Sequence, residues 1–266
     1  MVNLLIAAAL AAAPPAATAA PTTAEPAMFM VRDADTTIYI FGTFHALDSQ
    51  TQWFNTGVRD AFDQSNELVL ETLIPEGPVV PGKRGLPIRA PSVTPSASFL
   101  ATTKMAIDAG QAQGMQVSNG ADVILRHAAE EEGKQVEGLE TLEFQLNMFN
   151  SMPAATAIPA VQRQPGGDAA GPPIKSLSKT MVEMESAWKQ GDQKVFVSML
   201  EQLRNASPDT YRVMFTERNA RWADWIAARM QTPGTVFVAV GAGHLAGKDS
   251  LLVRLAEKGI GSTRVE

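Results

Sequence analysis

Two histidines occupy the same local position in the sequence, each three residues after a glycine. His45 follows Gly42, and His244 follows Gly241, so both belong to a GxxH pattern. Each pattern directly follows a stretch rich in β-branched and aromatic residues, which predicts a strand. A glycine at a strand end lets the backbone turn, and ligands bind beyond the strand ends of open α/β sheets. We therefore expect both imidazoles to face one crevice.

Two glutamates stand at the ends of two further predicted strands. Glu71 ends the apolar run that begins at Glu67, and Glu140 follows the run around Val136. Two neutral imidazoles and one carboxylate form an open coordination sphere for a divalent metal, with a position left for water. Such a metal lowers the pKa of its water toward about 7, and a second carboxylate can then act as general base. A purely structural role of these groups, as caps and turn partners, stays open.

A predicted helix carries a stripe of arginine and tryptophan side chains at helical spacing, namely Arg218, Trp222, Trp225 and Arg229. Arg218 on this otherwise apolar stripe needs an anionic partner. Two interpretations follow. Either Arg218 forms an ion pair that holds Glu71 or Glu140 in place, or it presents its guanidinium to a substrate oxyanion. His127 lies on another predicted helix without a matching partner, so we leave it outside the site.

The elements that must position these residues alternate between strand and helix patterns. Strands are predicted at 28–31, 37–41, 67–70, 134–138, 235–240 and 262–265. Helices are predicted at 55–65, 98–112, 120–132, 141–149, 177–189, 193–204, 208–230 and 250–258. The first two strands form a hairpin, and a βαβ unit follows. We predict a single α/β domain with a mixed central sheet flanked by helices, and with Pro-rich loops or lids at 75–95 and 153–173.

The composition excludes several classes of protein. The chain has 266 residues, and a formal net charge of -6 works against nucleic-acid binding. Cysteine is absent, which excludes disulfides, thiolate nucleophiles and Cys-based metal sites. Any metal must therefore bind to histidines, carboxylates and water.

The first residues have the pattern of a signal peptide. An uncharged apolar run spans 4–13, two prolines follow, and small residues at 17–19 stand at cleavage spacing. The run is too short to cross a bilayer core of about 30 Å. We therefore predict a signal peptide at 1–19, a domain at 27–266, a periplasmic or secreted location and no stable membrane insertion. An Ala-rich disordered tail is the alternative.

Five motifs together resemble the TraB/PrgY/GumN family: 38–45, 68–71, 133–141, 217–219 and 240–245. That family includes the TIKI metalloproteases and is related to erythromycin-esterase-like and ChaN-like folds. The resemblance implies that His45 and His244 are the paired motif histidines and that Glu71 is the motif glutamate. It also implies that Arg218 and Asn219 match a polar helix segment, and that the protein is a metal-dependent hydrolase acting on peptides.

The leading hypothesis is therefore an exported hydrolase that cleaves a peptide or another small amide or ester substrate. His45, His244 and Glu71 are expected to bind Mn, Co or Zn, with Glu140 as general base. Arg218 would stabilise charge or orient a carboxylate. The rival is a non-catalytic peptide- or haem-binding protein of the same fold. In a third interpretation, the strand-end groups only hold the loops together.

Overall fold

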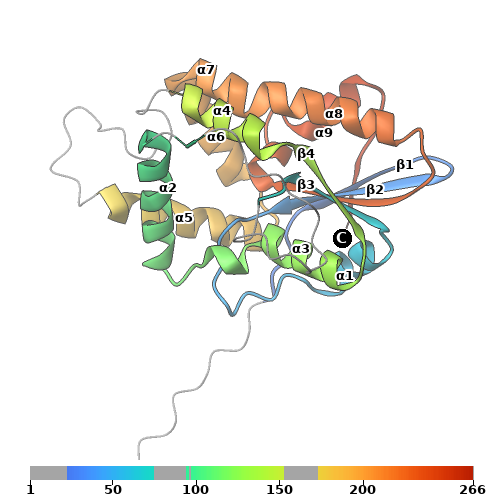
Figure 1. Cartoon of the computed structure of the whole chain (residues 1–266), viewed down its shortest axis with the longest axis horizontal. Coiled ribbons are helices and arrows are strands. Elements are labelled where there is room, and N and C mark those ends of the chain that lie inside the picture. The colour runs from blue at the N-terminus through green and yellow to red at the C-terminus, as the bar shows by residue number, and fades with distance from the viewer. Residues whose placement is uncertain (1–22, 75–93, 96, 153–172, 266) are drawn as a thin grey trace, which may run out of the picture.

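The computed structural model describes residues 23–74, 94–95, 97–152 and 173–265 (Figure 1). Its centre is a six-stranded sheet in the order β4-β3-β5-β2-β1-β6. The strands are β1 (Met28–Arg32), β2 (Thr36–Thr43), β3 (Glu67–Thr72), β4 (Gln135–Glu140), β5 (Gly234–Gly241) and β6 (Thr263–Val265). All six predicted strands are present, and the prediction of a single α/β domain is confirmed.

The sheet is mixed, and its parallel part holds the four strands that carry the candidate residues. β4, β3, β5 and β2 pair parallel, whereas β1 pairs antiparallel with both β2 and β6. The predicted hairpin is therefore β1–β2. The two strands of the predicted βαβ unit are β2 and β3. They are not neighbours in the sheet, because β5, from the last third of the chain, lies between them. Because the four strands are parallel neighbours, their carboxyl ends meet at one edge of the sheet.

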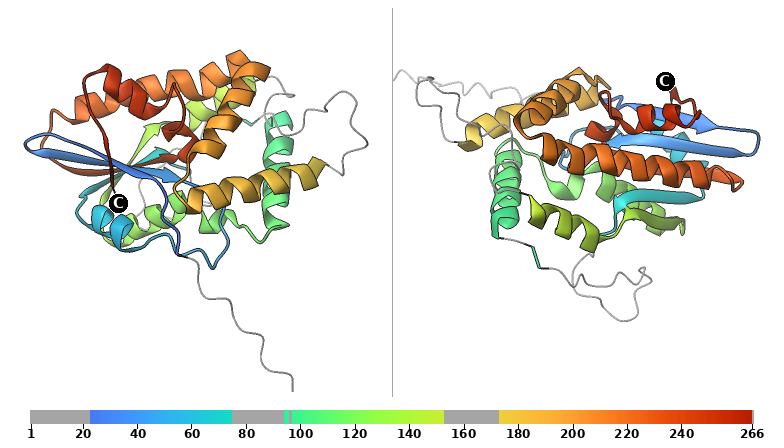
Figure 2. Two further views of the ribbon diagram at one scale, coloured as in Figure 1. Left: turned by 180° about the vertical axis from the view of Figure 1, so that it is seen from behind. Right: turned by 90° about the horizontal axis from the view of Figure 1, so that it is seen from above.

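Helices cover both faces of the sheet and extend beyond this edge (Figures 1 and 2). One face carries α1 (Thr56–Asp63) and α3 (Ala121–Glu131), and the other carries α8 (Glu217–Arg229) and α9 (Leu251–Glu257). Beyond the carboxyl ends lie α2 (Ala97–Gln111) and α5 (Pro173–Lys189), which pack against each other. The other helices are α4 (Leu142–Ser151), α6 (Lys194–Ala206), α7 (Pro208–Tyr211) and two short 3-10 segments, η1 (Val117–Asn119) and η4 (Ala242–Leu245).

Alternation along β5 explains the two-sided core. Val236, Val238 and Val240 pack with buried residues of α8 and α9. Phe237 and Ala239 point to the opposite face and pack with the core beneath α1 and α3. Successive side chains of a strand face opposite sides, so a continuous apolar run serves a sheet that is covered on both faces.

Local capping signals place several helix starts where the sequence predicts them. The hydroxyl of Thr141 accepts a hydrogen bond from the Phe144 amide at 3.1 Å, directly after β4. The hydroxyl of Ser250 accepts from the Val253 amide at 3.3 Å at the start of α9. A hydroxyl in this position satisfies one of the free amides at a helix N-terminus. The Thr141 cap therefore fixes where the chain turns away from the sheet at the end of β4.

The predicted helix at 208–230 is not a regular α-helix throughout. A π-helical segment, η3 (Arg212–Thr216), separates α7 from α8. A π turn inserts one extra residue per turn and is frequent at functional sites. Here the segment carries Met214 and Phe215, which both line a cavity described below.

Some predictions fall on parts of the chain outside the described residues. These are the signal peptide at 1–19, most of the Pro-rich loop at 75–95 and nearly all of the loop at 153–173. Among the residues that the structure does describe, no helix is long and apolar enough to cross a membrane.

Candidate functional site

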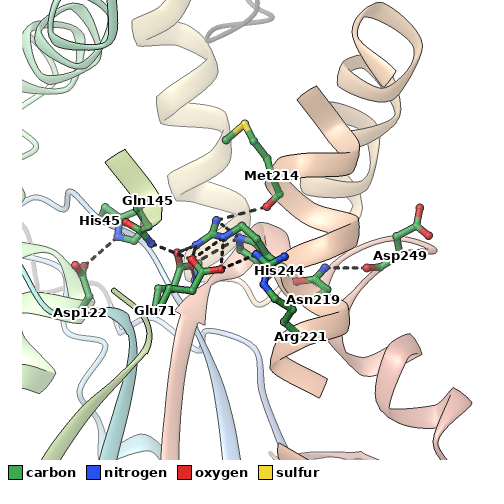
Figure 3. A network of polar contacts seen from close by, with 12 residues as sticks. His45, Glu71, Asp122, Gln145, Met214, Asn219, Arg221, His244 and Asp249 are labelled. Atoms are coloured by element: carbon green, nitrogen blue, oxygen red, sulfur yellow. Dashed lines mark hydrogen bonds and ion pairs between the residues drawn. The ribbon is translucent and has the colours of Figure 1, made fainter. Parts of the chain in front are cut away.

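The two GxxH histidines and Glu71 lie around a single point at the carboxyl edge of the sheet. A Cβ atom added to Gly241 would lie 3.1 Å from Oε1 of Glu71, 3.5 Å from Nε2 of His45 and 3.8 Å from Cδ2 of His244. Glu71 comes from β3, Gly241 ends β5, and His45 lies just past the end of β2. Parallel neighbouring strands thus bring together groups that are far apart in the sequence, as Figure 3 shows.

His244 is buried and held in one orientation by hydrogen bonds on both ring nitrogens. Its Nδ1 lies 2.7 Å from Oδ1 of Asn219, whose Nδ2 donates to the Asp249 carbonyl at 2.8 Å. The amide oxygen therefore faces the ring, so Nδ1 carries the proton and Nε2 the lone pair. Nε2 lies 3.2 Å from Nη1 of Arg218. Burial, with the charge of Arg218 in addition, lowers the pKa of His244 to about 3, so the ring is neutral.

His45 is oriented by Asp122, a residue outside the predicted site. Nδ1 of His45 lies 3.2 Å from Oδ1 of Asp122, in the first turn of α3. The side chain of His45 is 62% exposed, but that surface faces a cavity. Desolvation lowers the pKa of His45, yet the charges of Asp122 and Glu71 outweigh it and raise this pKa to about 9.

Gly120 explains how α3 comes close enough to His45. A Cβ atom at this position would lie 2.4 Å from the His45 carbonyl oxygen, so only glycine fits here. The next residue, Ala121, donates its amide proton to the Phe44 carbonyl at 3.0 Å. A glycine directly before a helix with an acidic first turn was the one available signal for Asp122.

Arg218 forms the cationic centre of the site. Its Nη2 donates to Oε2 of Glu71 at 2.7 Å, and its Nε donates to both oxygens of Glu140 at 2.9 and 3.1 Å. The guanidinium also lies 4.6 Å from the ring centroid of Trp222. Burial alone would raise the pKa of Glu71, but the charges of Arg218 and His45 and a hydrogen bond from the Gly241 amide at 2.7 Å lower it to about 2. Arg218 and Glu71 are thus a buried charged pair.

Glu140, the predicted general base, lies behind Arg218. Its carboxylate is almost fully buried and also accepts from Nη2 of Arg221 at 3.2 Å and Nε2 of Gln145 at 3.4 Å. It is not among the residues that line the adjoining cavity. The first interpretation of Arg218, an ion pair that fixes Glu71 and Glu140, matches these contacts.

A cavity of about 560 Å³ opens directly onto this cluster. His45, Glu71, Arg218 and His244 form the charged part of its lining, and apolar side chains make up most of the remainder, some of them from α2, α5 and α6. Phe215 of the π segment packs on the His244 ring, with centroids 4.9 Å apart. Volumes of 300–1,000 Å³, roughly, are typical of ligand pockets. The site therefore has room for a small molecule.

The donor atoms fit a divalent metal in their chemistry. Each imidazole has its Nδ1 next to an oxygen acceptor, the arrangement that orients Nε2 of metal-ligating histidines. The contact between Nη1 of Arg218 and Nε2 of His244 would compete with a metal ion for that nitrogen. Within the described part of the chain, no three His, Cys, Asp or Glu side chains form a group that could hold an ion. Nη1 of Arg218 also donates to the Met214 carbonyl at 3.4 Å, so it keeps a partner if it releases His244.

His127, which the sequence analysis left out, is exposed on α3 and does not line the cavity.

A family model described as TraB/PrgY/gumN matches residues 27–78 and 81–264, which covers nearly the whole described domain. No curated protein and no solved structure gives a significant match.

Proposed function

Since the chain belongs to the TraB/PrgY/gumN family, we propose that the cluster of His45, Glu71, Arg218 and His244 is the active site of a hydrolase for an ester or amide bond. The observation that carries this proposal is the convergence of three titratable side chains on Gly241 at the mouth of a ligand-sized cavity. Perturbed pKa values in such a place are typical of functional sites.

The chemistry needed is the addition of water to a carbonyl group. The water oxygen bonds to the carbonyl carbon, the C–O or C–N bond breaks, and the water proton ends on the leaving atom. Arg218, with Glu71 and Glu140 as fixed partners, presents a preorganised positive charge close to the developing oxyanion. Asp122 and Asn219 hold the two imidazoles so that each Nε2 is directed into the site.

A divalent metal such as Mn, Co or Zn remains part of this proposal. His45, Glu71 and His244 would hold it, and when bound it would polarise the carbonyl and acidify water. Once His45 is deprotonated, as a metal ligand has to be, the carboxylates of Glu71, Glu140 and Asp122 outnumber Arg218 and Arg221, and this charge favours a cation.

The contact between His45 and Asp122 also supports a metal-free version of the same reaction. A carboxylate beside Nδ1 and a lone pair on Nε2 are the features of a general base. In that version, Nε2 of His45 takes the proton of the attacking water only after it has lost its own, so with the pKa raised to about 9 the turnover should increase as the pH rises toward 9. For Glu140 we now propose a positioning role, because Arg218 and Arg221 occupy its oxygens.

The test combines metal analysis of the purified protein with His45→Ala and His244→Ala, assayed on ester and peptide libraries before and after chelation. Bound metal that both variants lose together with turnover supports the metal enzyme. Turnover that survives chelation but not His45→Ala supports the general base. The rival peptide- or haem-binding function is favoured by the large cavity, and ligand binding without turnover under any added metal would support it.

We also propose that the protein is exported to the periplasm or secreted, on the basis of the apolar run at 4–13 and the small residues at 17–19. Expression of the full chain followed by N-terminal sequencing tests this. A mature protein that begins near residue 20 outside the cytoplasm agrees with export, and an intact N-terminus in the cytoplasm contradicts it.

A further inference from the structure

Methionine is the commonest residue in the lining of the cavity beside the polar cluster. Six of the chain's 12 methionines line it: Met115, Met152, Met181, Met184, Met199 and Met214. Methionine is unbranched and flexible, so a cavity lined by methionines adapts to an apolar ligand of variable shape. A cavity wall with this composition indicates a flexible apolar ligand.

Polar side chains of the lining are concentrated at the strand ends. Beyond that cluster and the neighbouring Thr43, the polar side chains of the lining are Thr103 and Gln111, both on α2. A peptide brings one amide donor and one carbonyl acceptor per residue, and each costs free energy when it is buried without a partner. A hydrocarbon chain brings none. The interior of the cavity thus suits an acyl chain better than a peptide backbone.

The charges at the polar end favour a neutral head group. Arg218 is already paired with both Glu71 and Glu140, so a fully charged ligand carboxylate would have to compete with two protein carboxylates for it. A free carboxylate would also face the negative charge of Glu71, and His45, the other cation at this end, is already paired with Asp122. An ester carbonyl carries no charge and can accept a hydrogen bond there, whereas the carboxylate released by hydrolysis would be repelled.

Building on the proposed hydrolytic function, we propose that the substrate is a neutral single-chain ester whose unbranched acyl chain occupies the methionine-lined cavity. Its carbonyl lies at the cluster of His45 and Arg218. Hydrolysis adds the water oxygen to the carbonyl carbon and breaks the ester C–O bond, and the alcohol oxygen takes the proton. The products are a fatty acid and an alcohol.

The first experiment measures binding of monoacylglycerols, from hexanoyl to dodecanoyl, to the full-length protein below their aggregation concentrations. Each added methylene that enters the cavity should tighten binding by roughly three- to fourfold. Free fatty acids of the same lengths should bind more weakly than the esters. A Kd that does not depend on chain length overturns the proposal, as does preferential binding of an apolar peptide.

The second experiment changes the size of the cavity. Ala106→Phe, on the cavity wall in α2, should weaken dodecanoyl binding by about tenfold or more and leave hexanoyl binding unchanged. Met199→Ala should move the preferred chain length upward. Ala101→Phe is the matched control, because it is exposed on the same helix and does not line the cavity. The proposal is overturned if Ala106→Phe and Ala101→Phe have equal effects on binding. It is also overturned if Ala106→Phe and Met199→Ala shift the preferred chain length in the same direction.

Release of fatty acid, measured separately, distinguishes the two proposals. Chain-length-dependent binding without release contradicts the hydrolase and supports the acyl-chain site. Turnover of another ester or amide without chain-length dependence supports the hydrolase and overturns the acyl-chain site.

Discussion

Asn219 fixes the tautomer of His244: its Oδ1 lies 2.7 Å from Nδ1 of the ring, and its Nδ2 is held by the Asp249 carbonyl at 2.8 Å. Replacement of Asn219 by Asp would keep the acceptor but lose the donor to Asp249. Replacement by Leu would lose both. Asn219→Asp therefore tests the hydrogen bond that holds the Asn219 side chain in place, and Asn219→Leu tests in addition the hydrogen bond to the His244 ring.

We expect Asn219→Leu to lower metal affinity or turnover by roughly 10- to 100-fold, and Asn219→Asp to lower it less. The measurements are metal content and kcat/KM, with the melting temperature as a check on folding. Gln202→Leu, on α6 and outside the cavity lining, is a matched amide control that should leave both unchanged. Equal activity of Asn219→Leu and the parent protein would contradict the role given to Asn219.

Gly241→Ala tests the convergence of the site directly. The backbone at Gly241 has φ -52° and ψ 135°, which alanine adopts without strain. The added methyl group would lie among Glu71, His45 and His244, so turnover should fall at least about tenfold while the free energy of unfolding changes by less than about 1 kcal/mol. Gly261→Ala is the control, because nothing lies within 4 Å of its added Cβ. Full activity in Gly241→Ala would place the chemistry elsewhere.

Arg218→Met should be strongly destabilising, because it leaves the buried carboxylates of Glu71 and Glu140 without their shared cation. We expect a loss of about 3–5 kcal/mol in the free energy of unfolding, measured by urea denaturation. Arg221→Met removes a half-exposed partner of the same Glu140 and should cost less than about 1 kcal/mol. Equal losses in the two variants would mean that the buried pair is not the stabilising one.

Asp48 provides a test of pH-dependent stability away from the site. Burial raises its pKa, but hydrogen bonds from Lys189, Thr51 and the Gln50 amide outweigh this and lower it to about 2, below its ordinary value of 3.8. The folded state therefore gains stability above that ordinary value and loses the gain as the pH falls toward 2.

Asp48→Asn should cost about 1 kcal/mol at neutral pH, a figure reduced for partial exposure to solvent. The difference between the variant and the parent protein should disappear in denaturation curves at the acid end of this range. A difference that stays constant with pH would show that the ion pair with Lys189, at 2.8 Å, contributes nothing through its charge.

Much of the fold could be predicted from the sequence, because its signals are local. Short runs of apolar, aromatic or β-branched residues predict the strands, with Val136 as the weakest such signal in β4, and Thr141 and Ser250 cap helices as their side chains suggest. The GxxH pattern was informative for the same reason: each motif belongs to a strand and the turn after it. The family resemblance is confirmed by the match across residues 27–264, with a gap at 79–80.

The neighbours that orient these groups could not be predicted, because they depend on tertiary packing. Asp122 reaches His45 only because Gly120 allows α3 to approach the strand end. The cavity arises where α2, α5 and α6 meet beyond the sheet, and no pattern within one helix indicates a void between several. The π segment depends on an extra residue in a helical turn, which apolar periodicity does not reveal.

The position of β5 has a consequence for biosynthesis. This strand, which completes the sheet between β2 and β3, spans Gly234–Gly241 and is therefore synthesised after both of its neighbours. Until β5 is present, no strand lies between β2 and β3, and nothing brings His45 and Glu71 together. A nascent or truncated polypeptide that stops before this strand therefore lacks the neighbour that brings His45 and Glu71 together, so the cluster can assemble only after residues 234–241 have been synthesised.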